Sequence, residues 1–187
     1  MKYKSLLTIL ALIIGISSAT AQNDYFFKQG ERFDANIPTP EEFLGYQIGT
    51  LHTRHDAIVA YMFKLAELSD RVSIEVIGET YEHRKQLVLT ITSPENHSNL
   101  ESIRQKHLQL VDPDVKVTDF TGMKSMVLLG YNVHGNEPSS SEAALLTAYY
   151  YTAGQSAEVM TALDEAVIMV DPAYNPDGRD RHSTWAN

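Results

Sequence analysis

Residues 126–138 read MVLLGYNVHGNEP, an apolar run that leads directly into His134 and Glu137. The first eight residues, 126–133, are typical of a short buried strand, because they are almost continuously apolar and glycines lie near both ends. A helix is expected next, so His134 and Glu137 would lie at a strand-to-helix turn. Open α/β sheets commonly carry their chemistry at such turns.

The segment after the apolar run has the pattern expected at the start of a helix. Ser139 and Glu142 are three residues apart and form a capping-box signature, in which both side chains bind backbone N–H groups of the first turn. Gly135 lets the backbone turn sharply between the strand and this helix, because it has no Cβ. The sequence therefore predicts a tight connection that displays the intervening side chains.

His134 and Glu137 are candidate ligands for Zn²⁺. A neutral imidazole and a carboxylate both suit zinc, and a hydrolytic zinc site commonly uses two His and one Glu with a fourth position for water. Only two of these three ligands are visible in the motif. His-x-x-Glu pairs also arise by chance, so the spacing alone leaves open that both side chains merely hydrogen-bond a loop.

A second motif follows another apolar run, residues 166–170, which is also expected to be a buried strand. It reads DPAYNPDGR, residues 171–179, and the Asn-Pro-Asp-Gly part is ordinary turn chemistry when taken alone. Arg179 and Arg181 are interpreted as surface residues or as partners of the neighbouring aspartates, since exposed ion pairs are commonplace. Neither arginine is assigned a catalytic role.

Taken together and in this order, the two motifs resemble those of the zinc carboxypeptidase family, whose members are similar to pancreatic carboxypeptidases A and B. The resemblance covers roughly residues 56–187 and implies an α/β fold with a mixed sheet flanked by helices. It also implies that His134 and Glu137 are the first two Zn²⁺ ligands. Residues 175–178 match the turn that shapes the floor of the family's site.

Family members supply further groups, namely a third ligand His, a catalytic Glu and arginines that bind the substrate carboxylate. In the family's order these groups come later than Asn187. The resemblance therefore implies that residues 55–187 are the N-terminal part of a catalytic domain, with no catalytic residue within this chain and no activity of the fragment alone. The implied complete enzyme hydrolyses C-terminal bonds of a peptide or protein substrate.

Two other classes of protein remain open. A zinc amidohydrolase or deacylase of related fold would keep the same metal pair and would differ in its third ligand and carboxylate-binding arginines. A non-catalytic binding module would keep the fold without zinc chemistry. Metal binding separates the last class from the other two.

The N-terminal residues suggest export. Residues 1–21 carry two lysines, a short apolar core and the small-residue pattern Ala-Thr-Ala, which together are typical of a signal peptide and of a secreted or periplasmic protein. The apolar core is too short for a membrane span, so none is expected in the mature chain. Residues 22–54 hold prolines and scattered aromatics without a clear period, and are expected to form an extended arm.

Composition and periodicity complete the expected organisation. The formal net charge of −9 argues against a nucleic-acid partner, and the absence of cysteine leaves stability to the apolar core. His52 and His55 are expected to be solvated, and the tyrosines at 149–151 to serve packing. The remaining expected elements are a hairpin of strands at 72–80 and 86–93, and helices at 55–69, 99–110, 142–152 and 157–163.

Overall fold

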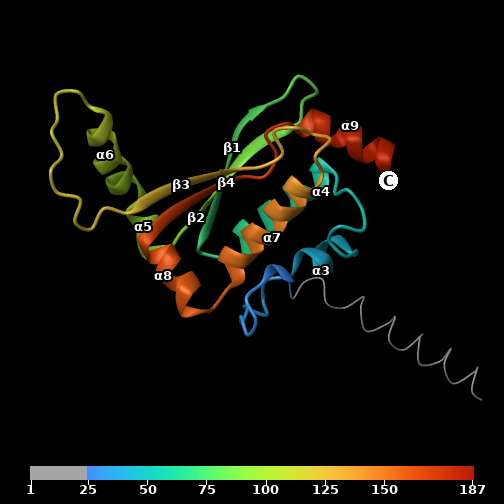
Figure 1. Cartoon of the computed structure of the whole chain (residues 1–187), viewed down its shortest axis with the longest axis horizontal. Helices are drawn as coiled ribbons and strands as arrows, with labels where there is room; N and C mark the ends of the chain where they lie inside the picture. The colour runs from blue at the N-terminus through green and yellow to red at the C-terminus, as the bar shows by residue number, and fades with distance from the viewer. Residues whose placement is uncertain (1–24) are drawn as a thin grey trace, which may run out of the picture. The chain divides into compact units, whose positions relative to one another are not determined.

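A computed structural model describes residues 25–187, so the expected signal peptide lies outside the described residues. Residues 32–187 form one compact unit, and the described residues before Arg32 belong to a separate unit. Figure 1 shows the larger unit, in which helices and strands are interspersed along the chain. They are α3 (Pro40–Leu44), α4 (His55–Leu68), β1 (Val72–Glu79), β2 (Lys85–Ile91), α5 (Pro94–Ser98), α6 (Leu100–Val111), β3 (Ser125–Gly130), α7 (Ser139–Ala153), α8 (Ala157–Glu165), β4 (Ala166–Asp171) and α9 (Pro176–Ala186).

The four strands form one mixed sheet with the order β1-β2-β4-β3. β1 and β2 are an antiparallel hairpin, β2 and β4 are also antiparallel, and β3 and β4 run parallel. The expected hairpin and the expected α/β fold with a mixed sheet are confirmed. The parallel pair matters most for the site, because parallel strands bring their carboxyl ends to the same edge of a sheet.

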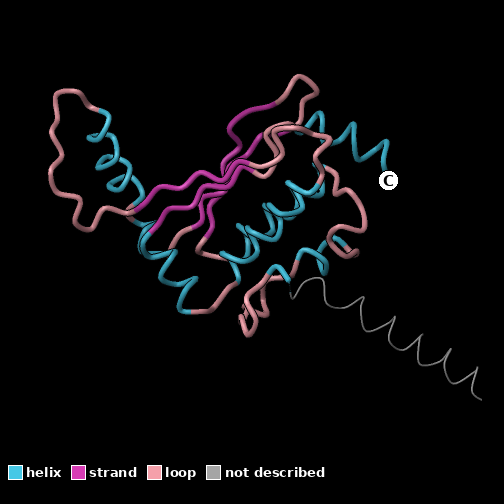
Figure 2. The backbone as a smooth tube through the Cα atoms, viewed as in Figure 1, coloured by secondary structure: helices cyan, strands magenta, loops and turns pink. Residues whose placement is uncertain are grey.

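Two helices cover one face of the sheet. α4 packs on β1 and β2, while α7 packs on β2 and β4, and Figure 2 shows both helices running along the same side of the strands. The stripe Ile58, Met62 and Leu65 of α4 is fully buried, as the helical spacing predicts. Burying each such side chain contributes roughly 1.5–3 kcal/mol.

The prediction that residues 126–133 form a buried strand is wrong in two respects. The strand β3 ends at Gly130, and most of its residues are exposed, including Met126, Val127 and Leu128. β3 is an edge strand of the described sheet, so only β4 pairs with it. β4 lies between two strands and is largely buried, as expected.

The segment expected to be an extended arm contains the short helix α3. Its N-cap, Thr39, forms a capping box with Glu42. Ile37 and Ile48 on either side of the helix are buried, and Phe33 bridges to Gly154 at the end of α7. Residues 32–54 therefore pack as part of the larger unit.

The expected helices at 55–69, 99–110, 142–152 and 157–163 are confirmed as α4, α6, α7 and α8. The helix α9 was not expected, because its sequence is strongly polar and has no apolar stripe. Tyr149 is buried and stacks on Phe33, which agrees with a packing role for the tyrosines. Within residues 25–187, no helix is long and apolar enough to cross a membrane.

Candidate functional site

The carboxyl ends of β3 and β4 bring the two sequence motifs together. Gly130 pairs with Asp171 at the ends of the two strands. Beyond them, the Tyr131 N–H donates to the Asp171 carbonyl at 2.9 Å, and the Tyr174 N–H donates to the Tyr131 carbonyl at 2.9 Å. The His-Gly-Asn-Glu-Pro segment, which we call the His134 loop (residues 134–138), therefore lies beside the Asn-Pro-Asp-Gly turn. The loop lies between β3 and α7, as expected for a strand-to-helix turn.

Asn132 organises the His134 loop from inside. Its backbone is left-handed, with φ of 53°, a conformation that asparagine tolerates better than most residues. Its side-chain amide donates to the carbonyls of His134 and Glu137 at 3.0 and 3.2 Å. The Glu137 N–H also donates to the His134 carbonyl at 3.0 Å, so the loop is a closed turn with a defined backbone.

The His134 loop rests directly on the start of α9 through Gly135. A Cβ atom at Gly135 would lie 2.0 Å from the carbonyl carbon of Gly178 and 2.4 Å from the nitrogen of Arg179. Non-bonded atoms do not approach this closely, so only glycine permits this contact between the two backbones. The turn at residues 175–178 thus supports the loop that carries the candidate ligands.

His134 and Glu137 are both exposed on this loop. Neither side chain forms a hydrogen bond or ion pair with another residue of the described part of the chain, so both are available to an external ligand. Within residues 25–187, no three His, Asp or Glu side chains gather to hold a metal ion. An imidazole and a carboxylate would suit two positions of a zinc site, which commonly takes three protein ligands.

A polar cavity of about 360 Å³ lies between the His134 loop and α9. Glu137 is on the same loop but does not line this cavity. The guanidinium of Arg181 has no carboxylate partner among the described residues. The cavity is lined by His134, Gly135, Asn136, Asn175, Gly178, Arg181, His182 and Trp185.

Arg179 was wrongly interpreted as a surface residue or a partner of neighbouring aspartates. Its side chain is fully buried, and its guanidinium binds Glu142 of α7 at 2.5 Å. Glu142 was likewise wrongly assigned to a capping box, because the N-cap of α7 is Pro138 and makes no side-chain cap bond. The carboxylate instead accepts from the Thr53 N–H and hydroxyl, both at 2.8 Å.

A sequence signal for this buried pair existed in α7. The helix sequence SSSEAALLTAYYYTA contains a single charged residue, Glu142, among small and apolar ones. A lone carboxylate on a helix that is otherwise suited to burial needs a cationic partner, since an unpaired buried charge is strongly destabilising. The pattern predicts a partner without identifying it, because Arg179 is 37 residues away.

A second group of charges joins α9 to the hairpin and to α4. Arg84 binds Asp177 at 2.9 Å and Asp180 at 2.7 Å, and Asp180 also accepts from the backbone N–H of His55 at 2.7 Å. The expectation that His55 is solvated is wrong, because it is buried at the start of α4. Burial lowers the pKa of its imidazole, which contacts the Lys85 carbonyl.

Asp171, at the end of β4, is nearly inaccessible to solvent. Desolvation by burial raises the pKa of its carboxyl to about 6, although the hydrogen bond donated by the Ala173 N–H opposes this effect. The folded-state pKa therefore exceeds the unfolded value of about 3.9. The charged carboxylate destabilises the fold as pH rises through about 6, and this penalty disappears below the unfolded value.

We expect Asp171→Asn to stabilise the protein at about pH 8 but not at about pH 4. Near pH 8 the gain should be roughly 2–3 kcal/mol, or several degrees in Tm, because asparagine accepts the same N–H without a charge. Thermal unfolding at both pH values measures the effect. The same change at exposed Asp114 is the control, and an equal gain for Asp171→Asn at both pH values would contradict the burial argument.

Comparisons with known proteins agree with the sequence motifs. The family model described as Zinc carboxypeptidase matches residues 58–187. No curated protein sequence gives a significant match. Among solved structures, thrombin activatable fibrinolysis inhibitor (TAFI) is similar with 19% sequence identity and a TM-score of 0.49, over 72% of this chain and 27% of that one.

Two further solved structures have similar values. Carboxypeptidase A from Helicoverpa armigera has 15% identity and a TM-score of 0.49, over 96% of this chain and 35% of that one. A metallo-carboxypeptidase from Burkholderia cenocepacia has 18% identity and a TM-score of 0.47, over 68% and 28%. This chain therefore spans about a quarter to a third of the length of these structures.

Proposed function

Since the chain belongs to the zinc carboxypeptidase family, we propose that it forms part of a peptidase that binds Zn²⁺ through His134 and Glu137. The reaction is hydrolysis of the C-terminal bond of a peptide or protein substrate. One observation carries the proposal. The two side chains lie on one hydrogen-bonded turn, are exposed, and have no competing partner among the described residues.

Bound zinc in such a site lowers the pKa of a water molecule and polarises the substrate carbonyl. The part assigned to this chain is to hold the metal. His134 offers a neutral imidazole and Glu137 a carboxylate, and neither is proposed to move a proton. The third ligand and the general base are assigned to none of the described residues, and the protein is proposed to act outside the cytoplasm.

We expect His134→Ala to weaken zinc binding by the 187-residue chain by on the order of 100-fold or more. Loss of a group that only orients a ligand already weakens metal sites by about 10–100-fold, and here one of two direct ligands is removed. The parent affinity itself should be low, because two protein ligands leave the remaining positions to water. Calorimetric titration of zinc into both proteins measures the difference.

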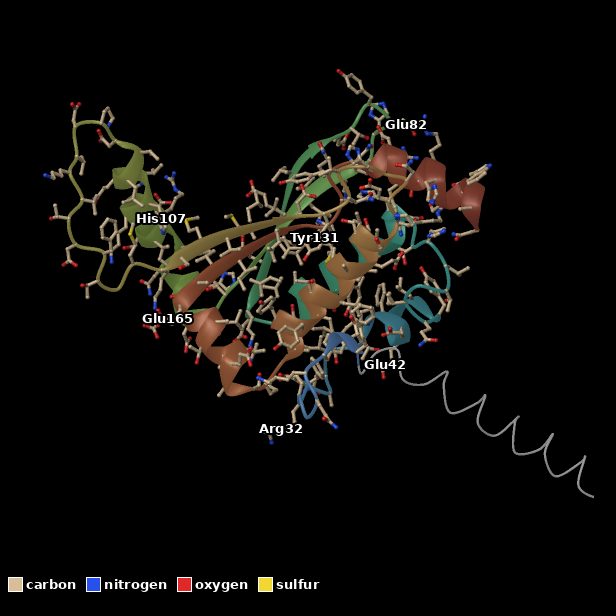
Figure 3. All side chains as sticks on the ribbon, in the orientation of Figure 1. Arg32, Glu42, Glu82, His107, Tyr131 and Glu165 are labelled. Atoms are coloured by element: carbon tan, nitrogen blue, oxygen red, sulfur yellow. The ribbon has the colours of Figure 1, made fainter. Side chains whose placement is uncertain are left out.

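His107→Ala is the matched control for this titration. The His107 imidazole contacts the Lys124 carbonyl at 2.7 Å, and Figure 3 shows it on α6, at the other end of β3 from Tyr131. Its removal should leave zinc affinity unchanged. Equal affinity of the parent and His134→Ala would place the metal elsewhere, and no zinc binding by the parent would favour the non-catalytic binding module.

A further inference from the structure

We propose that Arg179 is a positioning residue for the proposed zinc site, which it serves by fixing the backbone of the His134 loop. The inference rests on the proposed function, because it assigns His134 and Glu137 to the metal. Arg179 itself touches neither metal nor substrate. It contacts the loop at two separate points, and a buried partner holds its own side chain in place.

The first contact is made by the guanidinium. Its Nη1 donates to the carbonyl of Pro138 at 2.9 Å, and Pro138 directly follows Glu137 in the chain. Because the proline ring fixes φ of Pro138, holding its carbonyl also restricts the peptide group that joins Pro138 to Glu137. The candidate carboxylate ligand is therefore held from its C-terminal side.

The second contact is made by the backbone of Arg179. Its nitrogen lies beneath Gly135, where a Cβ atom would approach to 2.4 Å. Gly135 follows His134 directly, so this contact holds the candidate imidazole ligand from its C-terminal side. One residue thus supports the backbone next to both proposed ligands.

The remaining donors of Arg179 anchor the side chain to two other segments. Nε donates to the Thr53 carbonyl at 2.8 Å, and Nη2 donates to Glu142 at 2.5 Å. The side chain of Arg179 is completely buried, and that of Glu142 is only 8% exposed. Because each of its three nitrogens forms a hydrogen bond, the guanidinium has one defined orientation, which suits a group that must hold a loop in place.

The energetics of buried ion pairs favour the view that Arg179 and Glu142 position the loop rather than stabilise the fold. Buried ion pairs are expensive to desolvate, and an uncharged replacement of similar size is often neutral for folding. A pair that served stability alone could therefore be replaced without consequence. A pair that positions the loop could be replaced at little expense to folding, but zinc affinity would fall.

The double variant Glu142→Gln/Arg179→Met separates these two roles. The introduced glutamine cannot be charged but still offers an oxygen to the Thr53 N–H, while methionine fills the space of arginine without donating to Pro138. We expect this variant to fold and to bind zinc on the order of ten-fold more weakly than the parent. Zinc affinity equal to that of the parent would overturn the proposal.

Arg71→Met is the matched control, because Arg71 binds the C-terminal end of α7, whereas Arg179 binds Glu142 near its N-terminal end. Arg71 Nη1 donates to the carbonyls of Thr152 and Gly154, at 3.3 and 2.7 Å. Its loss removes arginine-to-carbonyl bonds from α7 without touching the His134 loop. We expect unchanged zinc affinity, and an equal loss in both variants would show that general destabilisation is responsible.

Amide hydrogen exchange without metal tests the positioning independently of zinc. The Glu137 N–H, bonded to the His134 carbonyl, should exchange faster in the double variant and at the parent rate in Arg71→Met. If the parent binds no zinc, the proposed function fails and this exchange rate alone decides whether Arg179 orders the loop. An unchanged rate overturns positioning whatever zinc does.

Arg179→Lys covers the case in which the double variant does not fold. Lysine keeps a cation beside Glu142, but it is a point charge without the rigid fork that reaches Thr53, Pro138 and Glu142 together. We expect a folded protein with faster Glu137 N–H exchange and weaker zinc binding than the parent. Parent-like values of both quantities would overturn the proposal.

Discussion

Gly135→Ala is expected to lower the free energy of unfolding by about 3 kcal/mol or more. The new methyl group would lie 2.0 Å from the carbonyl carbon of Gly178 and 2.4 Å from the nitrogen of Arg179. Both are backbone atoms at the start of α9, which cannot move aside as the end of a flexible side chain can. The His134 loop must therefore separate from α9, and urea denaturation measures the lost stability.

Gly78→Ala is the control, because Gly78 in β1 has ample space. Its added Cβ would meet only the side-chain oxygen of Gln86, at an ordinary contact distance of 3.8 Å. We expect a change within about 1 kcal/mol, since alanine at a compatible glycine position is tolerated or slightly stabilising. If both alanine variants lost the same stability, steric contact with α9 would not be the cause.

The comparison of β3 with β4 shows what periodicity can and cannot predict. Both runs are apolar and both were expected to be buried strands, yet only β4 is largely buried. An apolar run indicates a strand but not its place in the sheet, and β3 lies at the edge of the described sheet. The helices α4 and α7 were predictable because their patterns are long.

The helix α9 was missed although its start carries a recognisable signal. Asn175 caps the helix by accepting from the Gly178 N–H, and Pro176 occupies the first helical position. Asparagine as cap followed by proline is a common helix start, but Asn-Pro-Asp-Gly is equally a common turn. The polar residues that follow gave no periodicity to decide between them.

The candidate site could be predicted only where it is local in sequence. The placement of His134 and Glu137 at the carboxyl edge of the sheet follows from one continuous motif. Their support by Arg179 does not, because its contacts reach Thr53 and Glu142, which are 126 and 37 residues away. Partners at such separations depend on the packed fold and leave no spacing pattern in the chain.

Arg179→Met alone is expected to lower the free energy of unfolding by about 3–5 kcal/mol at neutral pH. It leaves the buried carboxylate of Glu142 without a cation and removes the donors to Thr53 and Pro138. Glu142→Gln alone should be comparably damaging, because it leaves the buried guanidinium of Arg179 without an anion. Each single substitution thus leaves one buried charge without a partner of opposite charge.

The double variant Glu142→Gln/Arg179→Met should lose less stability than the sum of the two single variants, by about 4 kcal/mol or more. It leaves no unpaired buried charge, so what remains is the loss of the hydrogen bonds to the Thr53 and Pro138 carbonyls, each worth about 1 kcal/mol. Urea denaturation of the four proteins, parent included, closes the cycle. Additive losses would mean that the two groups do not interact as a buried pair in solution.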